Sequence, residues 1–314
     1  MCVFLTDIHA QKATQFSQYM EYKSVLNPAD VASDEMMSVS GAYRLQWAGF
    51  KNAPKNLFLS MEYPVRIGDK KCGVGLFFSS DDVGLFKNQS VLLQYSYRFR
   101  LLGGELGLGV DVGFVNQKFD KESVDLTGDG ELMSGDEYHA EQDPFIDGFT
   151  ADEYSDVAFD VAFGAMYRNE NYYIGVSAFH LTSPTVEISS SENYCMYLPR
   201  TFLLTGGYEF QTHNPLWTVT PSSLIKTDFS TWQVDVSGVF EYSKKVRTGM
   251  SYRFADAFVF LFGIDVIQGL KFGYSYDLPA TKMIRSGGSH EVYLRYSFKP
   301  QFVKKNKYKS ERIL

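Results

Sequence analysis

The sequence alternates with a period of two over most of its length. From Met36 onward, apolar residues take turns with polar or small residues in one segment after another. The run 105–114 is the clearest case, because every second residue is Leu, Val or Phe and the residues between are Gly, Glu or Asp. Such alternation is typical of a β-strand with one face in an apolar environment. The sequence therefore predicts an all-β protein.

Fourteen segments show this alternation, and an even number suits a closed bacterial barrel. The predicted strands are 36–47, 55–64, 71–80, 87–100, 103–118, 155–168, 171–183, 200–212, 216–227, 230–242, 244–254, 256–266, 268–278 and 288–299. Counted from a periplasmic N-terminus, the even-numbered connections are all tight, whereas the odd-numbered ones include the longest loops. We therefore predict a closed transmembrane antiparallel β-barrel of about 14 strands, with long extracellular loops and short periplasmic turns.

Composition separates a membrane barrel from other membrane proteins. The chain has no stretch of about 20 apolar residues, which excludes membrane-spanning helices. Aromatic residues nevertheless make up 16% of the chain, which fits strands that expose every second residue to lipid. A soluble β-sandwich or lipocalin-like barrel, with its apolar face inward, is the alternative that the period alone leaves open.

The two ends of the chain differ from the predicted barrel. Residues 1–10 look like a signal-peptide remnant, because an apolar stretch precedes the small-residue exit Ile8-His9-Ala10; an ordinary frayed N-terminus is the alternative. Residues 11–35 are expected to form a periplasmic N-terminal segment and 36–299 the outer-membrane barrel. Residues 300–314 form a basic periplasmic tail, which either stays unstructured or docks on an acidic periplasmic partner.

One loop accounts for the net charge of −7. Residues 120–153 hold twelve carboxylates and one lysine, and the remainder of the chain has a surplus of positive charge. Oxygen-bearing side chains in this loop loosely follow the spacing of a calcium loop, which gathers several oxygens round a glycine turn. These candidate ligands are Asp125, Thr127, Asp129, Glu131 and Asp136. We interpret the loop as a solvated acidic surface, with calcium binding as the alternative, and predict no cofactor.

The predicted inner face carries charges of both signs. Its acids are Glu105, Asp111, Asp160, Asp235, Glu241, Asp277 and Glu291, and its bases are Arg98, Arg168, Arg247, Arg253, Lys271 and Arg295. Buried charges persist when they are paired or hydrated. The mixture therefore predicts either a salt-bridged, largely closed lumen or a water-filled lumen in which the charges are solvated.

The sequence offers no motif for catalysis. Nucleophile elbows, phosphate-binding loops, zinc-ligand pairs and dinucleotide-binding patterns are all absent. Ser289 and His290 are adjacent, but neighbours in a strand point to opposite faces and cannot join their side chains by a hydrogen bond. We predict that the protein is not an enzyme and binds no nucleic acid.

Short motifs occur from one end of the chain to the other. In the first half they occupy 15–20 (QFSQYM), 26–29 (LNPA), 43–50 (YRLQWAGF), 53–55 (APK) and 143–145 (DPF). In the second half they occupy 199–200 (PR), 206–208 (GGY), 221–226 (PSSLIK), 273–277 (GYSYD) and 288–294 (GSHEVYL). Together they resemble the PorP/SprF family of Bacteroidota.

The resemblance implies an outer-membrane barrel of the type IX secretion system, which exports adhesins and proteases and in some bacteria drives gliding. Its implied partners are outer-membrane lipids, periplasmic lipoprotein and ring components of the machine, and the C-terminal domains of secreted cargo or adhesins. The motif residues expected to serve structure or partner binding are Asn27, Pro28, Arg44, Gln46, Trp47, Pro54, Lys226, Tyr274, Asp277, His290 and Glu291. The candidate extracellular docking loop contains Asp125, Asp129, Glu131, Asp136, Asp143 and Phe145. A channel for hydrophobic or small polar solutes is the alternative function.

Overall fold

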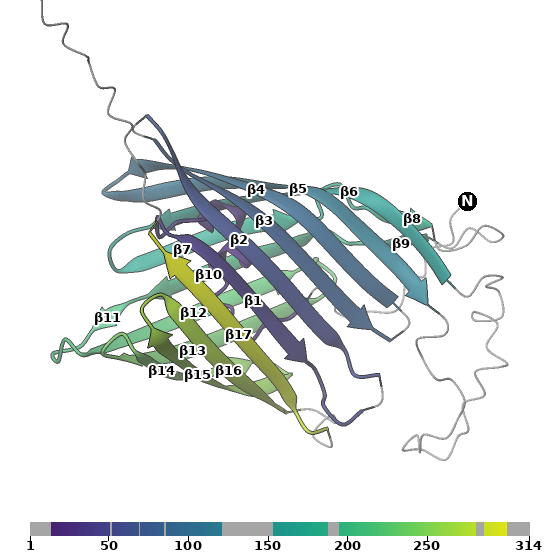
Figure 1. Ribbon diagram of the computed structural model, residues 1–314. Helices are drawn as coiled ribbons and strands as arrows, with labels where there is room; N and C mark the ends of the chain where they lie inside the picture. Colours follow the sequence, from purple (N-terminus) through teal and green to yellow (C-terminus); the bar gives the residue numbers. More distant parts are fainter. Residues whose placement is uncertain are drawn as a thin grey trace, which may run out of the picture.

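The chain folds into an antiparallel sheet that closes on itself (Figure 1). The computed structural model describes residues 14–50, 52–68, 70–84, 86–120, 153–187, 195–280 and 286–299. Fourteen strands make the wall of the barrel, and each pairs with its neighbours in chain order. The barrel is closed by β1 (Met37–Leu45) and β17 (Ser289–Phe298), which are the first and last strands.

Twelve further strands complete the wall, and a few short elements are not part of it. The other wall strands are β2 (Lys55–Ile67), β3 (Lys70–Val83), β4 (Phe86–Leu101), β5 (Gly104–Asp120), β6 (Glu153–Arg168), β7 (Tyr172–Phe179), β10 (Thr201–Tyr208), β12 (Trp217–Thr227), β13 (Trp232–Tyr242), β14 (Val246–Arg253), β15 (Ala257–Ile267) and β16 (Leu270–Pro279). The elements that are not part of the wall are the extension β11 (Phe210–Gln211), the hairpin of β8 (Thr185–Glu187) and β9 (Cys195–Tyr197), and the helices α1 (Lys23–Leu26) and η1 (Pro28–Asp30). No helix in the described ranges is long and apolar enough to cross a membrane.

The predicted fold is confirmed, since each of the fourteen predicted strands has a counterpart in the wall. The clearest difference concerns β7, which was predicted to reach residue 183 and ends at Phe179. The backbone at His180 and Ser183 has φ of 54° and 47°. A residue in this left-handed region interrupts an extended strand, so the alternating sequence continues beyond the strand itself.

The two ends of the barrel have different connections. The turn end, as we call it, carries the tight turns after β2, β4, β6, β13 and β15, and it is where β1 begins and β17 ends. In the β4–β5 turn, Leu102 and Gly103 have φ of 48° and 79°, which is the geometry of a type I′ hairpin turn. The opposite end, the loop end, carries the longest connections, which follow β1, β5, β7 and β16.

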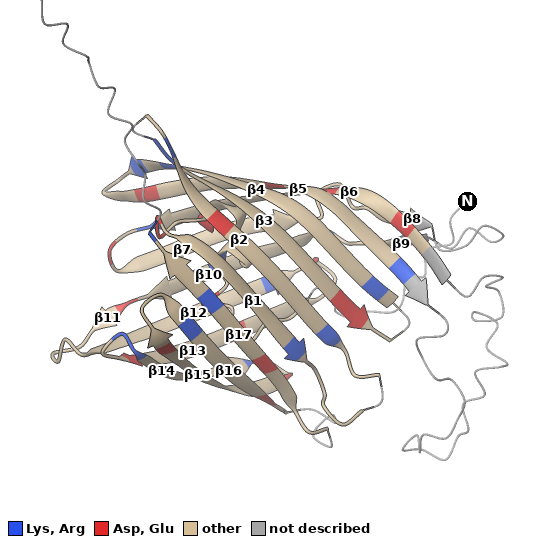
Figure 2. Cartoon of the chain, in the orientation of Figure 1, with Lys and Arg blue, Asp and Glu red and all other residues tan. Residues whose placement is uncertain are grey.

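The alternation of residue types corresponds to an alternation of environment. On β15, Phe258, Phe260 and Phe262 face outward and are 45–46% exposed, whereas Asp277 of β16 and Glu291 of β17 face the lumen and are buried. Figure 2 shows charges of both signs on the wall and long uncharged stretches along β3 and β4. Because the apolar residues are outside and many buried ones are polar, the soluble alternatives with an apolar interior are excluded.

The outward face provides a test of the membrane-spanning surface. Leu93 lies midway along β4 and is 66% exposed. Leu93→Arg should lower the free energy of unfolding in phospholipid vesicles by about 2–4 kcal/mol, because it moves a charge into the apolar layer. The matched control is Leu102→Arg in the β4–β5 turn, where the side chain is 88% exposed. Urea titration of both variants is the measurement, and equal stabilities would contradict the assignment of the lipid-facing surface.

Candidate functional site

Residues 14–36 run through the inside of the barrel, and we call this segment the plug (Figure 1). Tyr19 and Val31 of the plug are almost completely buried. We expected 11–35 to form a separate periplasmic segment, and the structure instead places 14–35 in the lumen; residues 11–13 lie outside the described ranges. Burial of these aromatic and aliphatic side chains against the wall favours this position over an exposed one.

The plug extends from the loop end to the turn end. Near the loop end, the hydroxyl of Thr14 donates a hydrogen bond to Asp81 of β3, and its carbonyl accepts one of 2.9 Å from Lys226 of β12. Near the turn end, Asp34 forms a 2.8 Å ion pair with Arg295 of β17. The described part of the plug therefore spans the length of the lumen.

Glycines in the wall allow the plug backbone to approach closely. A Cβ atom on Gly109 of β5 would lie 2.2 Å from the carbonyl carbon of Pro28. One on Gly164 of β6 would lie 2.1 Å from the side-chain oxygen of Asn27. Both distances are far below van der Waals contact, so only glycine fits at these positions without displacement of the plug.

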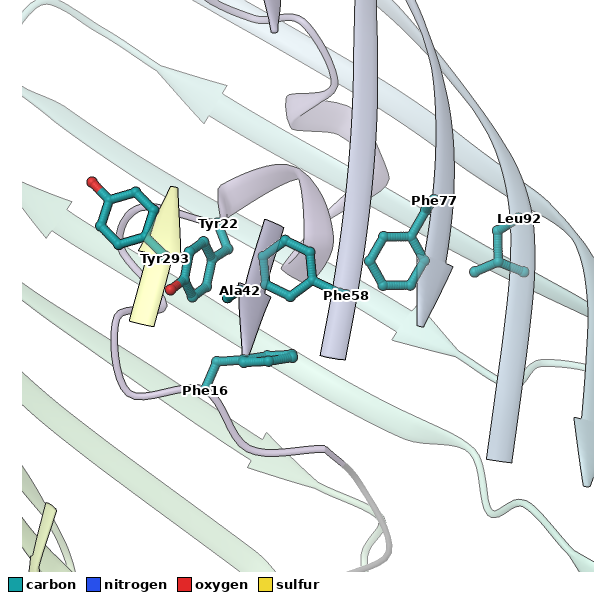
Figure 3. Close-up of a cluster of buried hydrophobic side chains, with 7 residues drawn as sticks. All are labelled: Phe16, Tyr22, Ala42, Phe58, Phe77, Leu92 and Tyr293. Atoms are coloured by element: carbon teal, nitrogen blue, oxygen red, sulfur yellow. The ribbon is translucent and has the colours of Figure 1, made fainter. Parts of the chain in front are cut away.

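An aromatic cluster holds the middle of the plug against the wall (Figure 3). The Tyr22 ring packs edge-on against Phe58 of β2, with 4.8 Å between centroids, and against Tyr293 of β17 at 5.5 Å. Phe16 contacts Phe58 in the same manner at 5.0 Å. Edge-to-face pairs of this kind contribute about 0.5–1.5 kcal/mol each beyond the area that they bury.

A buried ionic network at the loop end joins the plug to three wall strands. Arg44 of β1 contacts Asp277 at 2.7 Å and Glu291 at 3.5 Å. Ser17 of the plug lies between them, since its hydroxyl donates to Asp277 at 2.7 Å and accepts from Arg44 at 2.7 Å. Glu291 also accepts the backbone N–H groups of Ser17 and Gln18, at 2.7 and 3.0 Å. We call Arg44, Asp277, Glu291 and Ser17 the clamp.

Arg253 of β14 extends the clamp around the wall. It contacts Asp277 at 3.1 Å and Asp235 of β13 at 3.2 Å. All of these wall side chains are buried, and a buried charge is stable only when it is paired and hydrogen-bonded. The clamp therefore corresponds to the salt-bridged, largely closed lumen rather than to a lumen of solvated charges.

Further polar contacts fix the plug toward the turn end. Glu62 of β2 accepts hydrogen bonds of 2.6 Å from the Ser24 hydroxyl and from the Ala32 N–H. Asp30 forms a 2.5 Å ion pair with Arg168 of β6. The plug is thus bonded to the wall along its whole described length.

Glu35 of the plug is paired with cations at the turn-end rim. Its carboxylate lies 2.8 Å from the amine of Lys71 and also contacts Arg66. Hydrogen bonds from Lys71 and Arg66 lower the pKa of Glu35 to about 2. The carboxylate is therefore ionised at neutral pH, which keeps both cations occupied.

A cavity of about 140 Å³ remains between the plug and the wall. Apolar side chains line much of it: Phe16, Val25 and Leu26 from the plug and Phe77, Leu203 and Leu224 from the wall. The plug therefore narrows the lumen without filling it completely.

Comparison with protein families identifies the chain. The family model described as type IX secretion system membrane protein PorP/SprF matches residues 8–296, which is nearly the whole chain. This chain belongs to the PorP/SprF family. It is accordingly an outer-membrane component of the type IX secretion system. No curated protein is similar to the chain.

Solved structures similar to this PorP/SprF protein are outer-membrane barrels. A deletion mutant of the TodX monoaromatic hydrocarbon channel has a TM-score of 0.50 and 12% identity over 88% of this chain and 94% of its own. The Ralstonia pickettii toluene transporter TbuX has a TM-score of 0.49 and 12% identity over 87% of this chain and 92% of its own. At such low identity, the similarity to the TodX mutant shows the fold alone.

The structure brings together six of the motif residues predicted for the PorP/SprF protein, in the plug and around it. Arg44, Asp277 and Glu291 form the clamp, and Lys226 bonds to Thr14. Asn27, in the plug itself, donates to the carbonyls of Ala165 and Val176 at 3.0 and 3.1 Å, and Pro28 follows it against Gly109.

The other predicted motif residues lie away from the plug. In the loop after β1, the backbone N–H of Gln46 donates a 2.9 Å hydrogen bond to the carbonyl of Pro54. The backbone N–H of Trp47, in the same loop, donates to the hydroxyl of Ser289. The hydroxyl of Tyr274 and Nδ1 of His290 share a 2.7 Å hydrogen bond. Both residues lie on the outer face of the wall, opposite to Asp277 and Glu291. The predicted docking-loop residues Asp125, Asp129, Glu131, Asp136, Asp143 and Phe145, with the calcium candidate Thr127, lie outside the described residues. Within the described ranges, no group of His, Cys, Asp and Glu side chains could hold a metal ion.

Reasoning from sequence missed the plug residues that complete the site. Within 11–35 the prediction singled out only Asn27 and Pro28, and it did not include Ser17, Tyr22 or Ser24. Glu62 of β2, which binds the plug at two points, was also missed. The available signal was the density of aromatic residues at Phe16, Tyr19 and Tyr22, which is unusual for a solvated segment.

Displacement of the plug gives the first test of the site. Gly109→Val should push the plug away from β5, because its Cβ cannot fit beside Pro28. We expect higher conductance in planar bilayers and faster proteolysis of the plug. The control is Gly238→Val on β13, where nothing lies within 4 Å of the added Cβ. Unchanged conductance and proteolysis in Gly109→Val would contradict the close approach.

The clamp gives the second test. Arg44→Met should lower the free energy of unfolding by about 3–5 kcal/mol, because two buried carboxylates lose a shared cation. Arg295→Met, which breaks the more exposed pair with Asp34, should cost at most about 1 kcal/mol. Urea titration in vesicles measures both variants. A similar loss in the two would show that the clamp is not a special point of attachment.

Proposed function

We propose that this PorP/SprF protein is a non-catalytic, plugged scaffold that supports secretion and holds cargo proteins at the cell surface. The observation that carries the proposal is the bonding of the plug along the whole lumen, from Thr14 to Asp34. A lumen closed in this way is poorly suited to bulk passage. The surfaces left for partners are the two ends of the barrel.

The two ends suit different partners. Longer loops of outer-membrane barrels generally face outward and tight turns face the periplasm. On this orientation, the acidic loop 120–153 is available to the C-terminal domains of secreted cargo or adhesins. The turn end is available to the periplasmic lipoprotein and ring components of the secretion machine. In gliding bacteria, retention of adhesins at the loop end would contribute to motility.

A channel for hydrophobic or small polar solutes is the second candidate function. The cavity of about 140 Å³ beside the plug, which is lined by apolar and polar side chains, is the observation that favours it. Planar-bilayer recording of the unmodified protein distinguishes the two functions, with Gly109→Val as the reference for a displaced plug. Steady large openings of the unmodified barrel would support the channel, whereas a closed baseline supports the scaffold.

Shortening of the acidic loop tests the cargo-binding role. Asp120 of β5 pairs with Glu153 of β6, so residues 121–152 can be replaced by a two-residue Asn-Gly turn that preserves the ladder. We expect the barrel to assemble and cargo to be lost from the cell surface into the medium. Quantitative proteomics of the surface and medium fractions is the measurement.

A second variant separates the charge of this loop from its length. It keeps the full loop and converts its carboxylates to the corresponding amides. Release of cargo from this variant would show that the charge binds the partner, and retention would show that the loop itself is sufficient. Normal cargo retention in the shortened variant would overturn the assignment of the loop as a docking surface.

A further inference from the structure

A second cavity, of about 410 Å³, opens at the turn end of the lumen. Two carboxylates of the plug, Asp34 and Glu35, border it. Its cations are Arg66, Lys71 and Arg98 from the wall and Lys299, which directly follows β17. The cations outnumber the carboxylates, and Glu35 is already bonded to Lys71 and Arg66. Asp34 is bonded to Arg295. The cavity therefore has an excess of positive charge that its own carboxylates do not neutralise.

Arg98 is the unusual group in this cavity. It is only 5% exposed, and its Nη1 donates a 3.0 Å hydrogen bond to the carbonyl of Val31 in the plug. Its Nε and Nη2 have no hydrogen-bond partner among the described residues. No described carboxylate lies within ion-pair distance, since Asp30 pairs with Arg168 and Glu105 with Lys71. Burial of a charge with two unpaired donors is costly and calls for a partner.

The two unpaired donors indicate the chemistry of that partner. Nε and Nη2 lie on the same edge of a guanidinium group, and this edge can donate two parallel hydrogen bonds to one carboxylate or phosphate. A neutral acceptor could take these two hydrogen bonds, but it would add no negative charge beside Arg98. An oxyanion therefore fits this edge best.

The position of Arg98 restricts where the oxyanion comes from. Ser96 and Arg98 both bond to the Val31 carbonyl, at 2.8 and 3.0 Å, so Arg98 faces the lumen. A lipid on the outer surface would have to cross the wall to reach it. A soluble chain can enter through the turn-end opening. Of the possible sources, a protein carboxylate that approaches from this end fits the geometry best.

We propose that the turn-end cavity binds an Asp or Glu side chain from an acidic segment of a soluble partner, with Arg98 as the principal contact. The assignment of that partner to the periplasmic part of the secretion machine rests on the proposed function. The site itself can be tested without it, on the purified full-length barrel. Such a contact would also touch the plug through Val31, which places the partner next to the segment that closes the lumen.

The test measures binding of a fluorescein-labelled hexaglutamate peptide to the barrel in phosphatidylcholine nanodiscs. Arg98→Gln should weaken binding about tenfold or more, because charge-assisted hydrogen bonds are lost. Ser96→Ala is the matched control, because it removes the other hydrogen bond to Val31 and leaves the charge in place. It should change the affinity by less than about twofold, since no bond to the peptide is lost.

Several outcomes would overturn the proposal. Equal affinities of Arg98→Gln and the unmodified protein would exclude Arg98 as the contact. An equal loss in Ser96→Ala would assign the effect to displacement of the plug. Displacement of the peptide by phosphatidylglycerol in the nanodiscs, or by inorganic phosphate at the peptide concentration, would identify a lipid or a small anion as the occupant. None of these results bears on cargo retention in cells, so failure here is distinguishable from failure of the proposed function.

Discussion

The structure depends on the carboxylate of Glu291, which is completely buried in the lumen. A buried carboxylate needs several donors, and among the described wall residues only Arg44 contacts it, at 3.5 Å. The plug supplies the remaining donors through the N–H groups of Ser17 and Gln18 and the hydroxyl of Tyr22, at 2.7, 3.0 and 3.1 Å. Wall and plug are therefore interdependent, because the plug excludes water from Glu291 and supplies three of the hydrogen bonds that replace it.

This interdependence explains how a barrel can carry a polar interior without being an open pore. Several charges on the inner wall find partners in the plug or in one another, as in the pairs of Arg253 with Asp235 and Asp277. What remains accessible lies at the two ends. For a member of the PorP/SprF family, this arrangement favours contact with other proteins over transport through the lumen.

The wall of the barrel was predictable, because alternation along a strand directly reflects its two environments. In β5 the apolar residues from Leu106 to Phe114 face outward and the small or acidic ones face inward, as the sequence indicated. The end of β7 was not predictable, because the sequence beyond Phe179 still alternates while the backbone at His180 turns away. The alternation of residue types does not show where the backbone changes direction.

The plug could not be predicted for a different reason. Its side chains follow neither a strand nor a helical period, because it is an irregular chain shaped by the surrounding wall. The clamp was only partly predictable: Arg44 and Glu291 are direct neighbours once β1 pairs with β17, and Asp235 and Arg253 once β13 pairs with β14. The contact of Asp277 with Arg44 crosses an intervening strand, and only the closed barrel brings them together.

The position of the clamp has a consequence for biogenesis. Arg44 belongs to the first strand and Glu291 to the last, so the seam that completes the cylinder also carries the groups that bind Ser17. The interior segment precedes the first strand in the chain. Closure around an empty interior would leave Arg44 and Glu291 hydrated and without the bonds that Ser17 supplies. The final strand pairing and the binding of the N-terminal segment therefore use the same side chains, which couples closure of the cylinder to the filling of its interior.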